Sequence, residues 1–128
     1  MRAIYINGIM GLTPRSRKKI DKTIMISVAF TMKLLPGNEE EYEKRHNEIW
    51  PELVEILREA GIREYHIFLD KATGTLFAFQ NLEEENQTNH LAKETIMKKW
   101  WAFMGDIMET NPDQSPKVNR LEKVFSLK

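Results

Sequence analysis

The sequence contains no cysteine. Disulfides, thiolate metal ligands and thiol nucleophiles are therefore all excluded, and the absence is consistent with the reducing cytoplasm, where we expect the protein to reside. No apolar run approaches the roughly 20 residues that span a bilayer, so we expect no membrane partner. Neither a Gly-rich phosphate loop nor a dinucleotide fingerprint is present. We accordingly expect no cofactor.

An excess of charge of either sign is also lacking, because 19 basic residues balance 19 acidic ones. The balance is uneven along the chain. Residues 1–24 carry six Lys or Arg and one Asp, a net charge of +5, which leaves residues 25–128 with 13 basic and 18 acidic residues, a net charge of −5. A mildly acidic body is unsuited to a phosphate backbone, which requires clustered Lys and Arg. We therefore expect no nucleic-acid partner.

The length of 128 residues predicts a single domain. Residues 1–24 show no hydrophobic period, and we interpret them as a basic, poorly ordered N-terminal extension ahead of a domain over residues 25–128. A basic organelle-targeting arm is the alternative. The apolar part of this segment precedes its basic cluster, the reverse of the order in a secretory signal.

Hydrophobic periodicity and turn residues divide the domain into six elements. They predict a strand over 25–34, a helix over 38–60, strands over 62–69 and 75–82, an amphipathic helix carrying Met97, Trp100, Trp101, Met104 and Met108, and a last strand over 121–127. The order β-α-β-β-α-β is that of the α+β ferredoxin-like fold, in which two helices cover one face of a four-stranded antiparallel sheet.

The first predicted helix carries two local signals. Asn38 stands three residues before Glu41, a spacing that predicts a capping box at the helix start. Pro51 interrupts the helix, because its ring and missing N–H disfavour a regular turn before it. Either the helix kinks near Trp50, or Pro51 is the first residue of a second short helix.

The predicted strands carry large apolar residues on both faces, with Phe68, Phe77 and Phe79 opposite Tyr65 and Ile67. Helices can cover only one face of the sheet. We expect the other face to meet a second sheet, most simply in a symmetric homodimer.

His46 is the leading candidate for chemistry. Tyr42 precedes it by one helical turn and Trp50 follows it by one turn, so an imidazole lies among aromatic groups that can line a pocket. Its ordinary pKa of about 6.5 suits proton transfer near neutral pH. The alternative is a histidine that only completes the core.

Trp100 and Trp101 could stack on a ligand with an apolar face, such as the C–H face of a sugar, or could belong to the core. Tyr65 could donate to a ligand hydroxyl or to a backbone carbonyl. Asn111 and Asp113 could reach a pocket mouth, although a turn is the favoured interpretation. The three dispersed histidines lack paired carboxylates at ligand spacing, so we expect no metal site.

Five ordered blocks of residues 25–128 resemble the L-rhamnose mutarotase family. They are Glu41–Leu53 (EYEKRHNEIWPEL), Tyr65–Lys71 (YHIFLDK), Leu76–Ala78 (LFA), Lys99–Trp101 (KWW) and Asn111–Pro116 (NPDQSP). The resemblance implies a ferredoxin-like dimer of the α/β-barrel type. It implies that His46 is the proton donor and that sugar is bound by Tyr42, Tyr65, Trp100 and Trp101.

The resemblance further implies an isomerase that interconverts the α and β pyranose anomers of L-rhamnose by acid–base catalysis of ring opening and closure. Two alternatives on the same fold remain open from the residues alone. One is a small monooxygenase acting on aromatics or haem. The other is a dimer that binds a ligand without catalysis.

Overall fold

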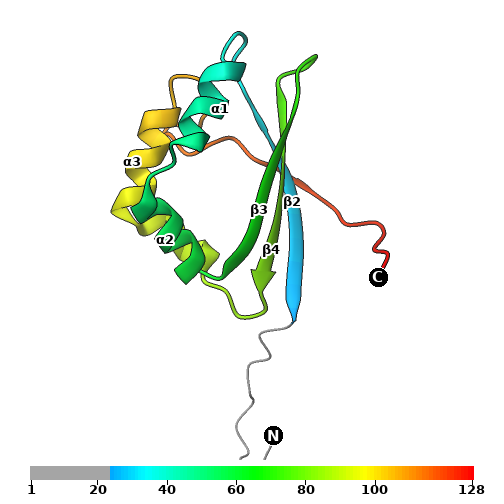
Figure 1. Ribbon diagram of the computed structural model, residues 1–128. Coiled ribbons are helices and arrows are strands. Elements are labelled where there is room, and N and C mark those ends of the chain that lie inside the picture. The colour runs from blue at the N-terminus through cyan, green and yellow to red at the C-terminus, as the bar shows by residue number, and fades with distance from the viewer. Residues whose placement is uncertain (1–23) are drawn as a thin grey trace, which may run out of the picture.

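The computed structural model describes residues 24–128, so the extension predicted over residues 1–24 lies, apart from Ile24, outside the described residues. Four antiparallel strands form one sheet in the order β3-β4-β2-β5 (Figure 1). Their bounds are Met25–Lys33 for β2, Ile62–Asp70 for β3, Thr75–Glu83 for β4 and Asn119–Leu121 for β5.

The helices lie together on one face of this sheet (Figure 1). They are α1 over Glu39–Asn47, α2 over Pro51–Glu59 and α3 over Thr95–Met104, with a 3₁₀ turn η1 over Thr88–Lys93. The predicted α+β, ferredoxin-like order is therefore confirmed. Within residues 24–128, every helix is too short or too polar to cross a bilayer.

The first predicted helix is split in two. Trp50 is extended (φ −66°, ψ 129°), the conformation favoured before a proline, and Pro51 occupies the first position of α2. The second of the two interpretations of Pro51 is correct. The break sets α1 and α2 at an angle along the sheet, with His46 near the end of the first and Leu53 in the second (Figure 1).

The predicted capping box at Asn38 is wrong. Asn38 directly precedes α1, but its side chain makes no cap hydrogen bond. The side-chain nitrogen instead donates to the carbonyls of Leu35 and Pro36, at 3.1 Å each. These bonds hold the carboxamide against the preceding turn, in an orientation in which its oxygen accepts no amide of α1.

Two elements are shorter in the structure than the sequence predicts. The helix α3 ends at Met104, and Met108 forms an isolated bridge with Leu34. The last strand covers only 119–121, opposite residues 29–31 of β2. Beyond Leu121 the chain leaves the sheet and runs to the C-terminus as an exposed segment (Figure 1). Residues 25–28 of β2 extend beyond this pairing and Lys123 still donates to the Ser27 hydroxyl, so the apolar alternation reported β propensity that did not become backbone pairing.

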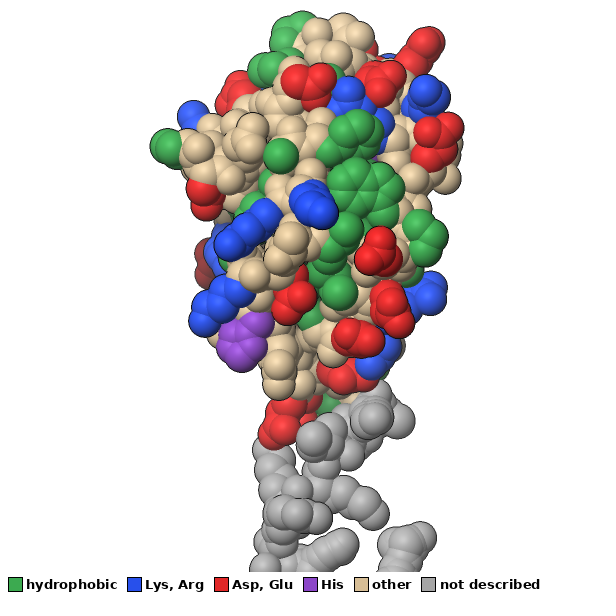
Figure 2. Space-filling model, turned by 90° about the vertical axis from the view of Figure 1, so that its left-hand side faces the viewer, with side chains coloured by type: hydrophobic (Ala, Val, Ile, Leu, Met, Phe, Trp, Pro, Cys, Tyr) green, Lys and Arg blue, Asp and Glu red, His purple; other side chains and the backbone are tan. Residues whose placement is uncertain are grey.

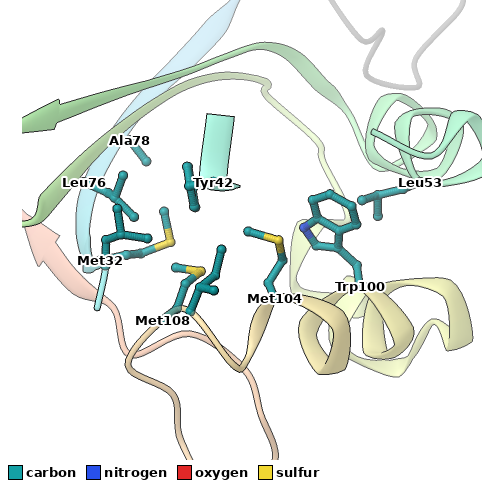
Figure 3. Close-up of a cluster of buried hydrophobic side chains, with 10 residues drawn as sticks. Met32, Tyr42, Leu53, Leu76, Ala78, Trp100, Met104 and Met108 are labelled. Carbon is teal, nitrogen blue, oxygen red and sulfur yellow. The ribbon is translucent and has the colours of Figure 1, made fainter. Parts of the chain in front are cut away.

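The core lies between the helices and the covered face of the sheet (Figure 3). Leu34, Leu53 and Leu76 are its most completely buried large side chains. Trp100 reaches from α3 toward Leu53 of α2, and Met104 follows it one turn later (Figure 3). This layer forms the floor and one wall of the cavity in which the candidate residues meet.

Candidate active site

A cavity of about 760 Å³ opens between the helices and the covered face of the sheet. This volume lies within the range of about 300–1,000 Å³ that is typical of small-molecule sites. The side chains of all five predicted residues line it: His46 and Tyr42 from α1, Tyr65 from β3, and Trp100 and Trp101 from α3. Two helices and a strand that are distant in sequence thus converge on one hollow.

His46 lies in this wall with one ring nitrogen occupied. Its Nδ1 is 3.1 Å from the carbonyl oxygen of Tyr42, one turn earlier on α1. Because a carbonyl only accepts, Nδ1 donates, and Nε2 is left as the nitrogen that can accept or deliver a proton. The bond also fixes the orientation of the ring.

Aromatic groups surround the imidazole. The ring centroid of Tyr42 is 4.3 Å away, and that of Trp100 is 5.4 Å away with the planes nearly perpendicular. Burial lowers the pKa of His46 below its ordinary value, and the hydrogen bond with the Tyr42 carbonyl opposes this shift. The neutral imidazole is therefore the main form at neutral pH.

The indole beside His46 comes from Trp100, not from Trp50 as the helix spacing suggested. Trp50 is absent from the cavity wall and packs edge-on against Trp100, with ring centroids 5.0 Å apart. The proline break turns Trp50 toward α3, where it also lies 5.5 Å from the ring of Phe103. Trp50 supports the wall from behind.

The two tyrosines present phenols that stay protonated. Desolvation raises the pKa of Tyr42 well above its ordinary value, and proximity to Tyr65 adds to the effect. Desolvation also raises the pKa of Tyr65 to about 12, while a hydrogen bond with Gln80 partly opposes the shift. Both hydroxyls are therefore hydrogen-bonding groups, and His46 is the cavity group suited to proton transfer near neutral pH.

The adjacent tryptophans have different surroundings. Trp100 is 6% exposed and belongs to the buried cluster, whereas Trp101 is partly buried against that cluster. Side chains one residue apart on a helix diverge by about 100°, yet both indoles reach the cavity. Trp101 is the better placed of the two to offer an indole surface to a ligand.

Of the two loop residues considered from sequence, neither lines the cavity. The side-chain nitrogen of Asn111 donates to Ser115 Oγ at 3.0 Å, and an Asp113 carboxylate oxygen accepts from the Ser115 amide at 3.0 Å. The favoured interpretation, a turn, is confirmed. Two other residues of this loop, Gln114 and Pro116, do line the cavity, and Gln114 is the polar one, which the sequence reasoning passed over.

Arg45, next to His46, was also missed. Its Nη1 donates to the Phe103 carbonyl at 2.7 Å, and its two Nη atoms face the Asp106 carboxylate at 2.9 and 3.3 Å. Its Nε donates to Glu41 at 2.7 Å. The fork links α1 to the C-terminal end of α3, and hydrogen bonding to Arg45 lowers the pKa of Asp106. Its position beside the histidine in the sequence was the available signal.

The helical side of the molecule shows apolar side chains along its middle, with charged side chains of both signs around them (Figure 2). Among residues 24–128, no three His, Cys, Asp or Glu side chains lie close enough together to hold a metal ion. The described cavity offers an imidazole, phenols, amides and aromatic surface, together with charged side chains that include the carboxylates of Glu39, Glu40, Glu43 and Glu64.

Comparison with known proteins gives a consistent result. A family model described as L-rhamnose mutarotase matches residues 27–127. An L-rhamnose mutarotase of Clostridium beijerinckii is 55% identical over 104 residues, which are 81% of this chain and 100% of that protein. The crystal structure of an L-rhamnose mutarotase from Formosa agariphila superimposes with a TM-score of 0.75 at 47% identity, covering 80% of this chain and 99% of the other.

A solved protein of Pseudomonas aeruginosa shares the fold at 15% identity, with a TM-score of 0.51 over 82% of this chain and 99% of that one. This likeness concerns the architecture alone. The family match and the close relatives span nearly all of the described residues, including each block that carries His46, Tyr65 and the tryptophan pair. The chain belongs to the L-rhamnose mutarotase family.

Proposed function

We propose that this protein is an isomerase, an aldose mutarotase that interconverts the α and β pyranose anomers of L-rhamnose. The observation that supports it most directly is the placement of a single near-neutral titrating group, His46, in the wall of a partly aromatic cavity with room for a sugar. The family match over residues 27–127 supplies the substrate. The comparisons give no support to the monooxygenase alternative.

The chemistry requires two proton transfers. When the pyranose opens, the ring oxygen gains a proton as the C1–O5 bond breaks, and the C1 hydroxyl gives one up to a base or to water as the aldehyde forms. After C1 turns, closure on the other carbonyl face reverses both transfers. No redox change occurs.

His46 is proposed as the proton donor. Its Nδ1 is held by the Tyr42 carbonyl, so Nε2 would protonate the ring oxygen on opening and recover the proton on closure. Acid–base help of this kind accelerates a reaction by about 10²- to 10⁴-fold. Fixing the sugar beside the ring adds to this through positioning.

Tyr42 and Tyr65 are proposed to bind sugar hydroxyls. Their raised pKa values keep the phenols protonated, so they would serve as hydrogen-bond donors and not as proton relays. Trp100 and Trp101 are proposed to pack against the C–H face of the pyranose and its C6 methyl group. That methyl makes rhamnose less polar than mannose, which suits a wall of indoles and aliphatic side chains.

A homodimer is proposed as the working assembly. Phe68, Phe77 and Phe79 project from the sheet face opposite the helices, and Phe68 is 68% exposed in the single chain. Phe68 and Phe77 are paired across β3 and β4, so they form one continuous apolar surface. A surface of this kind marks a contact site, and a second copy of the same sheet fits it by symmetry.

Saturation-transfer NMR on L-rhamnose tests the proposed reaction. Saturating one anomeric proton should attenuate the other faster with protein than in buffer. His46→Ala should reduce the protein-dependent transfer by about 10²- to 10⁴-fold, because the donor is gone. His90→Ala, an exposed histidine on the 3₁₀ turn outside the cavity, is the matched control and should keep the parent rate.

A folded parent protein that leaves the exchange at the buffer rate between pH 6 and 8 would refute the assignment. Equal rates in the parent and His46→Ala would instead refute the role of His46. The same experiment excludes a purely ligand-binding protein, since binding without catalysis cannot raise the exchange rate.

A further inference from the structure

The loop over residues 111–116 holds one side chain in a costly conformation. Gln114 has φ +72°, the only positive φ of a non-glycine residue among residues 24–128. Glycine, Asn and Asp adopt this left-handed region readily, whereas Gln does not. Such residues persist where the surrounding structure holds them, and they are concentrated at functional sites.

Hydrogen bonds around Gln114 hold the loop in place. The Asn111 amide donates to the Ser115 carbonyl at 2.8 Å, and the Gln114 amide donates to the Asn111 carbonyl at 2.9 Å. Asn111 and Asp113 add side-chain bonds to Ser115. The polar side chains on either side of Gln114 are thus committed to building the turn. The side chain of Gln114 is not needed for it.

Gln114 lies in the cavity wall, with its carboxamide nitrogen beside Gly105. Within the described chain its side chain makes no hydrogen bond. The side-chain nitrogen lies 3.5 Å from where a Cβ on Gly105 would stand. Gly105 follows α3 and comes one turn after Trp101. The amide therefore lies against the end of α3, close to the tryptophan with the partly exposed indole.

We propose that Gln114 is a substrate-binding residue, whose carboxamide hydrogen-bonds a ring hydroxyl of the sugar while Trp101 packs against the adjoining C–H face. This rests on the proposed function. A carboxamide has both a donor and an acceptor, as a sugar hydroxyl does, so it can satisfy that hydroxyl in either role. Much of the cavity wall is hydrocarbon, and a hydroxyl buried there without a partner is unfavourable.

The identity of the residue supports this role. Glycine or asparagine would suit the backbone at φ +72° better, but glycine has no side chain and asparagine is one methylene shorter. The longer glutamine amide extends from this turn to the end of α3, beside Gly105. The strain is thus explained by the reach of the side chain into the cavity, and not by the turn.

The test measures KM by anomer exchange, the dissociation constant for L-rhamnose by tryptophan fluorescence, and the melting temperature. Gln114→Leu keeps the size but removes the hydrogen bond, and it should raise KM and the dissociation constant about three- to tenfold with little change in kcat. Gln114→Gly should show the same loss of binding with an unchanged or higher melting temperature, because the backbone strain is relieved. Gln87→Leu, an exposed glutamine outside the cavity, should match the parent in every respect.

Monodeoxy analogues of L-rhamnose then identify the partner. The analogue that lacks the contacted hydroxyl should bind the parent and Gln114→Leu equally. Unchanged constants in both Gln114 variants of an active parent would overturn the proposal. So would a fall of several degrees in the melting temperature of Gln114→Gly, which would assign Gln114 to the turn. An inactive parent would refute the proposed function itself, independently of Gln114.

Discussion

At the scale of single residues, the candidate site depends on pKa values that separate one group able to exchange a proton near neutral pH from two groups that stay protonated. Burial moves the pKa of His46 down and those of Tyr42 and Tyr65 up. Desolvation disfavours the charged form in all three cases, so one physical cause leaves the imidazole neutral and both phenols protonated. The imidazole is then the only one of the three that can exchange a proton at low cost near neutral pH.

This separation predicts the pH dependence of catalysis. If His46 protonates the ring oxygen, the active form is the imidazolium, whose fraction falls as pH rises above a pKa that lies below 6.5. The protein-dependent kcat/KM should therefore fall by about tenfold per pH unit between pH 7 and 8. It should level off only below the pKa. Anomer exchange measured against matched buffer blanks checks this.

The opposite profile has a clear meaning. A kcat/KM that rises or stays constant from pH 7 to 8 would show that His46 is not the donor and that its neutral form removes the C1 proton instead. His90→Gln provides the control, since an exposed histidine outside the cavity should leave the profile unchanged.

At the scale of elements, the sequence predicted what depends on local pattern and missed what depends on contacts. Alternation and helical spacing found the strands, the helices and their order. The candidates Trp100 and Trp101, which line the cavity, were singled out because aromatic residues stand out in a sequence. Arg45 and Gln114 were missed because each is notable only for its contacts in the fold. The partners of Arg45 lie at the end of α3, about 60 residues along the chain, and the Gln114 side chain lies beside Gly105, which follows α3.

The errors have the same origin. Asn38 fits a capping box, yet its amide is taken by two carbonyls of the preceding turn. The pattern over 121–127 fits a strand, yet pairing ends at Leu121 opposite Ala29, although β2 continues to Met25. Local propensity states what a segment can form, and the contacts made in the folded chain decide what it does form.

The link between α1 and α3 gives a prediction at this scale. The Arg45 side chain is only 12% exposed and connects His46's helix to the Phe103 carbonyl and Asp106. Arg45→Gln should lower the free energy of unfolding by about 1–2 kcal/mol, because charge-assisted bonds between two helices are lost while Asp106, largely exposed, is rehydrated. Urea denaturation followed by circular dichroism measures this.

Lys44→Gln is the matched control, since it removes the same charge from the neighbouring exposed position of α1. Its denaturation midpoint should stay close to that of the parent. Equal midpoints for Arg45→Gln and Lys44→Gln would mean that the fork contributes nothing to the packing of α1 on α3.

At the scale of the whole molecule, the sheet separates the candidate cavity from the face that we propose for association. Every residue proposed to act on the sugar lines the cavity on the helical side and comes from one chain. The opposite face carries Phe68, Phe77 and Phe79, and the C-terminal segment adds exposed Val124 and Phe125. The fold thus allows association and catalysis to be changed separately.

A charge placed on the face proposed for association tests this separation. Phe68→Glu puts a carboxylate at the most exposed of the three phenylalanines, where a dimer would have to bury it unpaired. Light scattering coupled to size exclusion should show a dimer for the parent and a monomer for Phe68→Glu. Lys98→Glu, which changes the charge at an exposed position of α3, is the control and should remain a dimer. Because the cavity residues belong to one chain, the monomer should retain a KM for L-rhamnose within about threefold of the parent, a change smaller than one lost hydrogen bond. A parent that is monomeric at micromolar concentration would refute the dimer, and a monomeric Phe68→Glu without sugar binding would show that the two sides are coupled through the sheet.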